Sequence, residues 1–246
     1  MKRLTVITVT FNAETTLEQT IRSVVNQTAF DQIEYILVDG FSTDRTLQIA
    51  KLYRNQFARI ICEPDQGIYD AMNKGARLAT TPWICFMNAG DTFFNDQVIE
   101  KLNLPEEAQE IIYGNAMIKA GKGMWEQKPN PFWTQKDKCN GIGICHQALF
   151  TPTSWLLEHP FEFTQYQYCC DYEFCWWCWK RGRTFRHINL PICFFEWGAG
   201  FSSKPSAARK VLNENARIAH CRWGYWHLRH IWRQWRANRH SQTKCV

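Results

Sequence analysis

Short apolar runs alternate with segments of helical spacing over residues 4–87 of the chain. The runs are predicted to form strands over residues 4–10, 33–38, 59–62 and 83–87, and the first of them is β-rich and apolar, as a buried strand should be. The segments between them predict helices over residues 14–26, after Ser42 and over residues 69–79. This alternation predicts an α/β fold, in which helices flank a mostly parallel sheet on both faces.

The second half of the chain has a less regular pattern. Residues 111–118 are predicted to form a strand, and residues 119–138 a loop rich in Gly, Lys, Pro and Trp. Residues 171–181 are predicted to form a helix that ends at Gly182. We expect one continuous domain over residues 1–204 and a basic, aromatic helical extension over residues 205–246.

The length and composition allow a buried core and argue against a membrane span. The chain has 246 residues, and 45% of them are hydrophobic. No apolar run approaches the roughly 18 residues that are needed to cross a bilayer. The apolar stretch near the amino terminus is too short for a secretion signal. We therefore expect a cytoplasmic protein.

The cysteines number eleven and are scattered along the chain. An odd count without an export signal favours reduced thiols over a disulfide framework. Cys175 and Cys178 form a CxxC pair, for which Cys139 and Cys145 are candidate zinc-binding partners. Since no second closely spaced pair accompanies it, we interpret these residues as buried thiols that pack like small apolar groups.

The positive charge is concentrated at the carboxyl end. The whole chain has a net charge of +6, whereas residues 209–246 contain nine Lys and Arg and a single acid, so that this tail carries +8 and the rest −2. Residues 222–236 combine aromatic side chains and arginines at helical steps, as in a basic amphipathic helix that lies on anionic lipid. We expect this helix to bind the inner face of the plasma membrane. Packing of the same stripe on the catalytic domain is the open alternative.

Polar or acidic residues follow each predicted strand of the first half. In parallel sheets, ligands bind at the carboxyl ends of the strands. The residues at these ends are Thr10, Asn12, Asp39, Asp65, Asn88 and Asp91. They form an acidic rim that would repel nucleic acid, so we expect no nucleic-acid partner. Asn73 and Lys74 lie within the third predicted helix, where Asn has a low propensity and suggests a contact.

The loop after the first strand lacks the glycines of dinucleotide-binding and P-loop motifs. Phosphates bound at this sheet would therefore need another source of positive charge, and a divalent cation held by a carboxylate is the obvious one. Asp91 is the candidate ligand, with a turn residue after Gly90 as the equally weighted alternative. Asp39 is similarly either a ligand of a nucleotide base or the first residue of an Asp-Gly turn.

Four motifs, taken together, resemble the family-two glycosyltransferases of the GT-A fold. They cover residues 23–28, 38–46, 67–75 and 86–91, in the order and spacing of that family, and the likeness continues weakly through His146-Gln147, Asp171-Tyr-Glu and residues 198–202. Among its subgroups, the chain is most similar to the colanic-acid and exopolysaccharide transferases, which share the string over residues 63–75.

The resemblance implies a role for each candidate residue. Asp171 would be the catalytic general base, and Asp91 would hold Mg²⁺ or Mn²⁺ on the diphosphate. His146 and Gln147 would contact the acceptor or the pyrophosphate. The donor would be bound by Thr10, Asn12, Asp39, Asp65, Asn73, Lys74, Asn88 and Asp91. One departure is the metal motif, which is usually Asp-x-Asp-Asp and is Asn88-Ala-Gly-Asp91 here.

These roles predict an inverting glycosyltransferase. It would move a sugar from a nucleotide-sugar to a lipid-linked or oligosaccharide acceptor in surface polysaccharide biosynthesis, by a single displacement with Asp171 as the base. Three alternatives stay open at this point. The chain could act on a protein or small molecule, it could be a non-catalytic sugar-nucleotide binder, and Asp171 could be only the N-cap of its helix.

Overall fold

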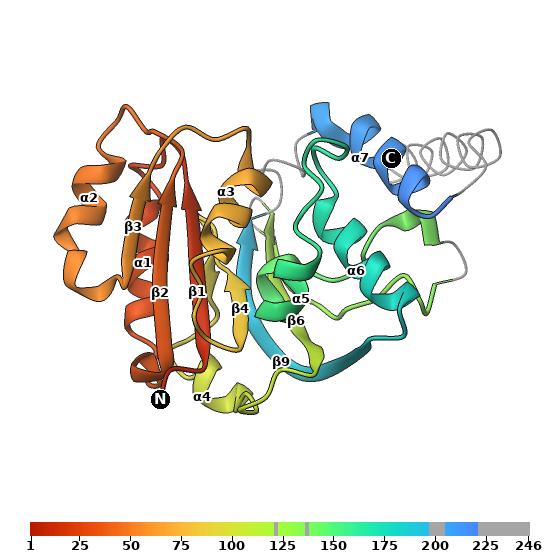
Figure 1. Ribbon diagram of the computed structural model, residues 1–246, viewed down its shortest axis with the longest axis horizontal. Coiled ribbons are helices and arrows are strands. Elements are labelled where there is room, and N and C mark those ends of the chain that lie inside the picture. Colours follow the sequence, from red (N-terminus) through yellow and green to blue (C-terminus); the bar gives the residue numbers. More distant parts are fainter. Residues whose placement is uncertain (121–122, 136–137, 197–204, 221–246) are drawn as a thin grey trace, which may run out of the picture.

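The computed structural model describes residues 1–120, 123–135, 138–196 and 205–220 (Figure 1). A nine-stranded sheet runs through the described part of the chain in the order β3-β2-β1-β4-β8-β6-β9-β5, with β7 paired to β6. The strands are β1 Leu4–Thr10, β2 Ile33–Asp39, β3 Arg59–Cys62, β4 Trp83–Phe86, β5 Thr92–Phe93, β6 Glu110–Ala120, β7 Gly123–Gln127, β8 Leu149–Pro152 and β9 Thr184–Glu196. The α-helices are α1 Leu17–Val25, α2 Thr46–Leu52, α3 Ile68–Ala76, α4 Val98–Leu102, α5 Thr153–Glu158, α6 Cys170–Lys180 and α7 Ala208–Ile218.

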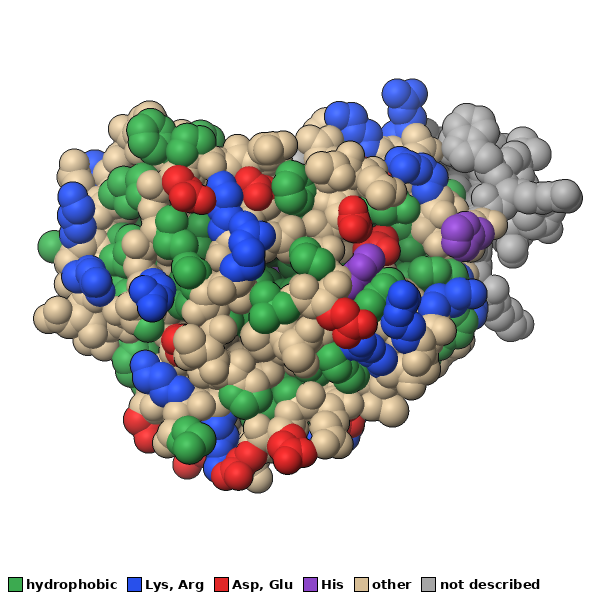
Figure 2. All heavy atoms as spheres, viewed as in Figure 1, with side chains coloured by type: hydrophobic (Ala, Val, Ile, Leu, Met, Phe, Trp, Pro, Cys, Tyr) green, Lys and Arg blue, Asp and Glu red, His purple; other side chains and the backbone are tan. Residues whose placement is uncertain are grey.

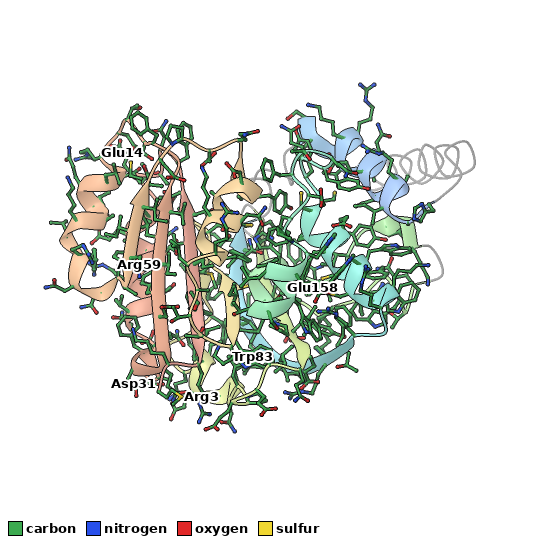
Figure 3. All side chains as sticks on the ribbon, viewed as in Figure 1. Arg3, Glu14, Asp31, Arg59, Trp83 and Glu158 are labelled. Carbon is green, nitrogen blue, oxygen red and sulfur yellow. The ribbon has the colours of Figure 1, made fainter. Side chains whose placement is uncertain are left out.

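The first four strands form the parallel arrangement that the sequence predicts. β1 pairs in parallel with both β2 and β4, and β2 pairs in parallel with β3. The α/β prediction, with helices flanking a sheet, is thus confirmed. The sheet as a whole is mixed rather than mostly parallel, because the pairs β4–β8, β6–β8, β6–β7 and β5–β9 are antiparallel. Figure 3 labels Glu14 at the edge where these strands end, and Arg3 and Trp83 at the opposite edge. Every residue that directly follows a strand of this half therefore lies on the same side of the molecule.

Apolar side chains cover both faces of the sheet. Leu4 and Val6 of β1 pack with α1 on one face, whereas Ile7 and Val9 pack with α3 and α6 on the other. Helix α3 lies very close to the strands, because a side chain at Gly75 would come within 2.6 Å of the Ile7 side chain. This close packing fixes the helix that carries the 67–75 motif against the centre of the sheet.

Three predicted helix boundaries of the first half were wrong by a few residues. α1 begins at Leu17, after a turn closed by hydrogen bonds to the Ala13 carbonyl. α2 begins at Thr46 rather than near Ser42, and the Asp44 carboxylate accepts a hydrogen bond from the Thr46 amide at 2.9 Å. α3 ends at Ala76, because the backbone hydrogen bonds that follow join residues only three apart, from the Leu78 amide to the Gly75 carbonyl and from the Ala79 amide to the Ala76 carbonyl.

The second half departs further from the sequence prediction. The predicted strand over residues 111–118 lies within β6, but the predicted loop over residues 119–138 contains β7. All five residues of β7 are exposed, and its two large apolar residues, Met124 and Trp125, are adjacent, so the sequence has no apolar alternation to indicate a strand. β8 pairs antiparallel with β4 and β6, and β9 runs parallel to β6. The sequence analysis missed both of these strands.

The predicted carboxyl-terminal extension is described only through residue 220. Its helix α7 packs on α6 and on the short turn Lys138–Asn140. The predicted amphipathic helix over residues 222–236 and the motif over residues 198–202 lie outside the described residues. In the described part of the chain, no helix has the length and apolar character to cross a membrane. Cys175 and Cys178 are free, buried thiols on α6.

Candidate functional site

Three cavities lie in sequence along the carboxyl ends of the central strands. The first cavity has a volume of about 510 Å³, and the second and third have about 310 Å³ each. The first and second share the residues Ile68, Tyr69, Asn88 and Ala89. The second and third share His146, Gln147, Tyr168, Asp171 and Phe195. The second cavity is therefore bounded by a large pocket on one side and a smaller one on the other.

The first cavity is lined by Thr10, Asp65 and Asn88 among the predicted donor-binding residues. The Thr10 Oγ1 atom is buried and has no hydrogen-bond partner among the described residues. Asp65 accepts a hydrogen bond from the Gly67 amide at 2.9 Å. A buried hydroxyl without a partner is costly, so the Thr10 side chain is suited to a ligand that completes its hydrogen bonding.

Asn12 and Asp39 lie beside the first cavity without lining it. The fully buried Asp39 carboxylate accepts hydrogen bonds from the Ser42 amide at 2.8 Å and the Ser42 hydroxyl at 2.5 Å. The Asn12 side chain accepts one from the Thr43 amide at 2.9 Å, and the Asn12 backbone has a φ of 47°. The bonds to Asp39 close the turn after β2, and the bond to Asn12 fastens that turn to the loop after β1. Nucleotide contacts by these two residues stay a prediction.

Asn73 and Lys74 use their polar groups on the protein itself. The Asn73 amide donates to the Phe161 carbonyl and accepts from the Phe161 amide, both at 2.9 Å. Lys74 Nζ lies 3.2 Å from Glu63 and 3.3 Å from Asp70. Burial lowers the pKa of Lys74, but hydrogen bonds to these two carboxylates outweigh burial and raise it above its ordinary value. Neither residue lines the first or second cavity, and their donor contacts stay predictions.

Asp91 lies in the second cavity, after a turn at Gly90 with a φ of 105°. Its Oδ2 atom accepts a hydrogen bond from Gln147 Nε2 at 2.7 Å. Burial raises the pKa of Asp91 to about 7, and the hydrogen bond from Gln147 opposes this rise only in part. A bound cation would favour the ionised carboxylate. The structure thus brings the predicted metal ligand Asp91 together with Gln147.

Asn88, His146 and Asp171 form a chain across the second cavity. Asn88 Nδ2 lies 2.9 Å from His146 Nε2, and His146 Nδ1 lies 3.9 Å from Asp171 Oδ2. Burial lowers the pKa of His146, and the charge of Asp171 opposes this in part. A neutral imidazole that accepts from Asn88 at Nε2 carries its proton on Nδ1, toward Asp171. In this arrangement the buried Asn88 Oδ1 has no partner among the described residues.

Asp171 is the second residue of α6, whose N-cap is Cys169. The alternative that Asp171 is the N-cap was therefore wrong. The Asp171 Oδ1 atom accepts a hydrogen bond from the Tyr172 amide at 2.9 Å. The Tyr69 hydroxyl lies 3.1 Å from the same oxygen and 3.0 Å from the Tyr168 carbonyl, so that it can donate to either. The Asp171 side chain is 17% exposed and faces both the second and third cavities.

A divalent cation fits this site only if a bound substrate supplies some of its coordinating atoms. Among the described residues, no group of three or more His, Cys, Asp and Glu side chains could enclose a metal ion. The Asp91 carboxylate and the unpartnered Asn88 Oδ1 nevertheless border the same cavity. Carboxylate and amide oxygens are ligands of hard cations, and Mg²⁺ commonly takes one or two carboxylates together with substrate phosphates. The residues therefore fit a cation that also binds phosphate.

Tyr69 and Tyr168 are site residues that the sequence analysis did not single out. Tyr69 is 7% exposed, and burial raises its pKa well above the ordinary value, with the charge of Asp171 as the next cause. It belongs to the 67–75 motif, which was the available signal. Tyr168 lines both the second and third cavities, but no local pattern in the sequence distinguishes it.

Comparisons with known proteins identify the family of the chain. The family model described as glycosyl transferase family 2 matches residues 5–148. Over 151 residues, the chain is 32% identical to a protein from Mycobacterium tuberculosis named PGL/p-HBAD biosynthesis glycosyltransferase, a match that covers 59% of this chain and 57% of that protein. It is 27% identical over 192 residues to the uncharacterized glycosyltransferase EpsJ of Bacillus subtilis, covering 76% of this chain and 50% of EpsJ. The chain thus spans about half the length of these relatives.

Two solved structures are similar in fold. S. aureus TarS 1–349 in complex with UDP-GlcNAc has a TM-score of 0.66 and 16% identity, over 88% of this chain and 66% of TarS 1–349. The mannosyltransferase PcManGT from Pyrobaculum calidifontis, in complex with GDP-Man and Mn²⁺, has a TM-score of 0.57 and 18% identity, over 78% of this chain and 56% of that protein. These matches show the GT-A fold. Because the family model covers more than half of its residues, the chain belongs to glycosyl transferase family 2.

Proposed function

We propose that the chain transfers a sugar from a nucleotide-sugar to a lipid-linked or oligosaccharide acceptor, with inversion of the anomeric centre. The observation that carries this proposal is the placement of Asp91 and Asp171 in the second cavity, next to a pocket of about 510 Å³. That pocket has the size range of ligand sites. Family membership and the UDP-GlcNAc and GDP-Man complexes of TarS and PcManGT support a nucleotide-sugar as the donor.

The donor would lie across the first and second cavities. The unpartnered Thr10 hydroxyl and Asp65 would contact its nucleoside, and Asn88 and Asp91 would face its diphosphate. A cation held by Asp91 and Asn88 would neutralise charge on the leaving nucleoside diphosphate. Gln147 would keep the Asp91 carboxylate in place through its hydrogen bond of 2.7 Å.

The acceptor would enter through the third cavity, because Asp171 faces that cavity as well as the second. Asp171 would remove the proton from the acceptor hydroxyl as the oxygen attacks the anomeric carbon. Tyr69 and His146 would hold the Asp171 carboxylate between the two substrates. Attack from the side opposite to the leaving diphosphate inverts the anomeric centre.

A role in surface polysaccharide biosynthesis is the finer part of the proposal. It is supported by the similarity of residues 63–75 to the colanic-acid and exopolysaccharide transferases, and by a relative named for PGL/p-HBAD biosynthesis. The basic segment over residues 222–236 would bring the enzyme to a lipid-linked acceptor at an anionic membrane.

A thermal-shift screen of UDP-, GDP- and dTDP-sugars with Mn²⁺ or Mg²⁺ tests the donor assignment, since a ligand that binds only the native state raises stability. The expected result is a shift with one nucleotide class that requires the cation. Release of nucleoside diphosphate and an inverted anomeric configuration in the product, read by NMR, then test the reaction. Binding without any release, in the presence of a range of acceptors, would favour the non-catalytic alternative.

A further inference from the structure

Glu214 of helix α7 makes an unusual set of contacts with the segment that precedes α6. Its side chain is buried, with 9% exposure. The Oε1 atom accepts a hydrogen bond from the Gln167 amide at 2.8 Å. The Oε2 atom accepts two more, from the Tyr168 amide at 2.8 Å and the Cys169 amide at 3.0 Å. One carboxylate thus satisfies three consecutive backbone N–H groups.

The three residues held by Glu214 border every part of the candidate site. Gln167 lines the first cavity, Tyr168 lines the second and third, and Cys169 lines the third. Cys169 is also the N-cap of α6, and its side chain makes no capping hydrogen bond. Asp171 follows two residues later. The amino end of α6 is therefore stabilised by a carboxylate from another helix, which is the favourable charge at that end.

Other side chains of α7 fasten the same region. The Arg217 guanidinium lies 5.1 Å from the centre of the Tyr166 ring, and Lys210 Nζ lies 5.7 Å from that of Tyr168. Val211 and Asn215 line the third cavity. Figure 2 shows the Lys and Arg side chains over α7 at the upper right, whereas Glu214 is buried beneath this surface. Helix α7 therefore forms a wall of the site.

We propose that Glu214 is a positioning residue for the transfer reaction. It holds residues 167–169 so that Asp171 and Tyr168 keep their places between the second and third cavities. This inference rests on the proposed function, in which Asp171 is the general base. It assigns part of the active site to the predicted carboxyl-terminal extension, and it makes that extension necessary for turnover on a soluble acceptor as well as at a membrane.

The charge and length of the side chain both matter to this role. A glutamine at position 214 offers only one acceptor oxygen to three donors and directs an NH₂ group at a backbone N–H. An aspartate keeps the carboxylate but withdraws it by one methylene. Hydrogen bonds to charged groups are stronger than neutral ones, and an unsatisfied buried donor is costly. Both substitutions should therefore release the segment while leaving the sheet intact.

The test compares Glu214→Gln with Glu34→Gln. Glu34 is also buried, at 8% exposure, and also accepts three hydrogen bonds, from Thr5 and Thr80, but at the opposite edge of the sheet. Arg209→Gln, on the exposed face of α7, is the second control. Each variant is assayed for release of nucleoside diphosphate from the sugar nucleotide chosen by the thermal-shift screen, at a temperature where circular dichroism shows a folded protein.

We expect Glu214→Gln to lower kcat by roughly tenfold to a hundredfold, as a misplaced catalytic group does, with a much smaller change in the donor KM. Glu214→Asp should fall between this variant and the wild type. Glu34→Gln should lose about as much thermal stability as Glu214→Gln but keep the wild-type kcat. Arg209→Gln should have the wild-type stability and kcat. Wild-type kcat in Glu214→Gln, or equal losses of kcat in Glu214→Gln and Glu34→Gln, would overturn the proposal.

Two further outcomes are decisive. If neither Glu214 variant folds, α7 is an element of the fold and the positioning role is wrong. If Asp171→Asn retains full activity, the proposed function fails, whatever Glu214→Gln does. If Glu214→Gln has the wild-type kcat while Asp171→Asn is inactive, the positioning role of Glu214 is wrong and the proposed function is not contradicted.

Discussion

The two halves of the sheet contribute to the candidate site in different ways. In the half formed by β1–β4, the site residues lie at or just beyond the ends of strands, as Thr10 is the last residue of β1 and Asn88 lies two residues beyond β4. In the half formed by residues 110–218, they lie on a short turn, as His146 does, or on the first turn of a helix, as Asp171 does. The first half uses its ladder of strands to place side chains, and the second half uses loops.

Loops that place functional groups need contacts that hold them in position, and side chains from two helices supply these contacts. Asn73 of α3 binds both backbone groups of Phe161, and Glu214 of α7 binds three amides of residues 167–169. Both contacts hold the chain between β8 and α6. Residues outside the cavities can therefore matter as much for the site residues of the second half as the strands do for those of the first.

The largest effect is expected for Asp171→Asn, which removes the proposed base from the half formed by residues 110–218. The substitution keeps the shape of the side chain, so donor binding in the first cavity should persist. Transfer should fall by roughly two to four orders of magnitude, the usual contribution of a positioned base. The measurements are turnover and nucleotide affinity by calorimetry.

A matched control for Asp171→Asn lies two residues further along α6. Glu173 is in the same first turn and pairs with His159 at 2.9 Å, but it lines none of the three main cavities. Glu173→Gln should therefore turn over at nearly the wild-type rate. If Asp171→Asn instead abolishes donor binding, Asp171 belongs to the nucleotide pocket rather than to the reaction.

The second prediction concerns Asp91, where the two halves meet through Gln147. Asp91→Asn keeps a hydrogen-bonding partner for Gln147 but removes the negative charge that a cation requires. Turnover should fall by roughly a hundredfold, since a bound cation stabilises the transition state by several kcal/mol. The measurement is turnover against Mn²⁺ and Mg²⁺ concentration. Wild-type turnover by this variant in excess EDTA would show that the cation role is wrong.

The sequence predicted the first half of the fold well because its signals are local. The strands β1, β2 and β4 are short, buried runs, and polar residues lie at or within a few residues of the carboxyl end of each one. Thr10, Asp65 and Asn88 all line the first cavity, as expected of strand ends. The roles of Asp39 and Asn12 were harder to predict, because an Asp-Gly turn and a donor site use the same residue types. In the structure, the two side chains accept hydrogen bonds from the Ser42 and Thr43 amides.

The second half could not be predicted as fully, because its contacts join distant residues. Glu214 is 45 to 47 residues away from the amides that it binds, and no periodic pattern reports such a pairing. β7 has the sequence Gly-Met-Trp-Glu-Gln, in which the two large apolar residues are adjacent and do not alternate with polar ones. The motifs His146-Gln147 and Asp171-Tyr-Glu were identified from resemblance, whereas Tyr168 had no signal.

The third prediction concerns Thr10, at the end of β1 in the half formed by β1–β4. Thr10→Val removes the unpartnered hydroxyl without changing the volume of the side chain. If a donor completes its hydrogen bonding there, nucleotide affinity should fall by up to about tenfold, which corresponds to one hydrogen bond. The kcat at saturating donor should stay near the wild-type value. Thr10→Ser keeps the hydroxyl and is the control, and equal affinities for Thr10→Val and the wild type would remove Thr10 from the donor site.

The smallest effect on turnover is expected for Glu34→Gln. Glu34 lies in β2, in the half formed by β1–β4, and lines none of the three cavities. Burial favours the neutral acid, but hydrogen bonds from Thr5 and Thr80 outweigh it and hold the pKa of Glu34 below its ordinary value of 4.5. A carboxyl whose pKa is lowered by folding contributes stability above its ordinary pKa, and that contribution is lost as the pH falls through the folded value.

Glu34→Gln should therefore lower the free energy of unfolding at pH 7 by about 1–3 kcal/mol, the usual cost of leaving a buried group unsatisfied. The difference from the wild type should narrow as the pH falls below about 4.5, which urea denaturation at several pH values would measure. The kcat at pH 7 should not change, because the first half holds its site residues through strand ladders. A loss of kcat in the folded variant would mean that the amino edge of the sheet is coupled to the site, and the contrast between the two halves would then be wrong.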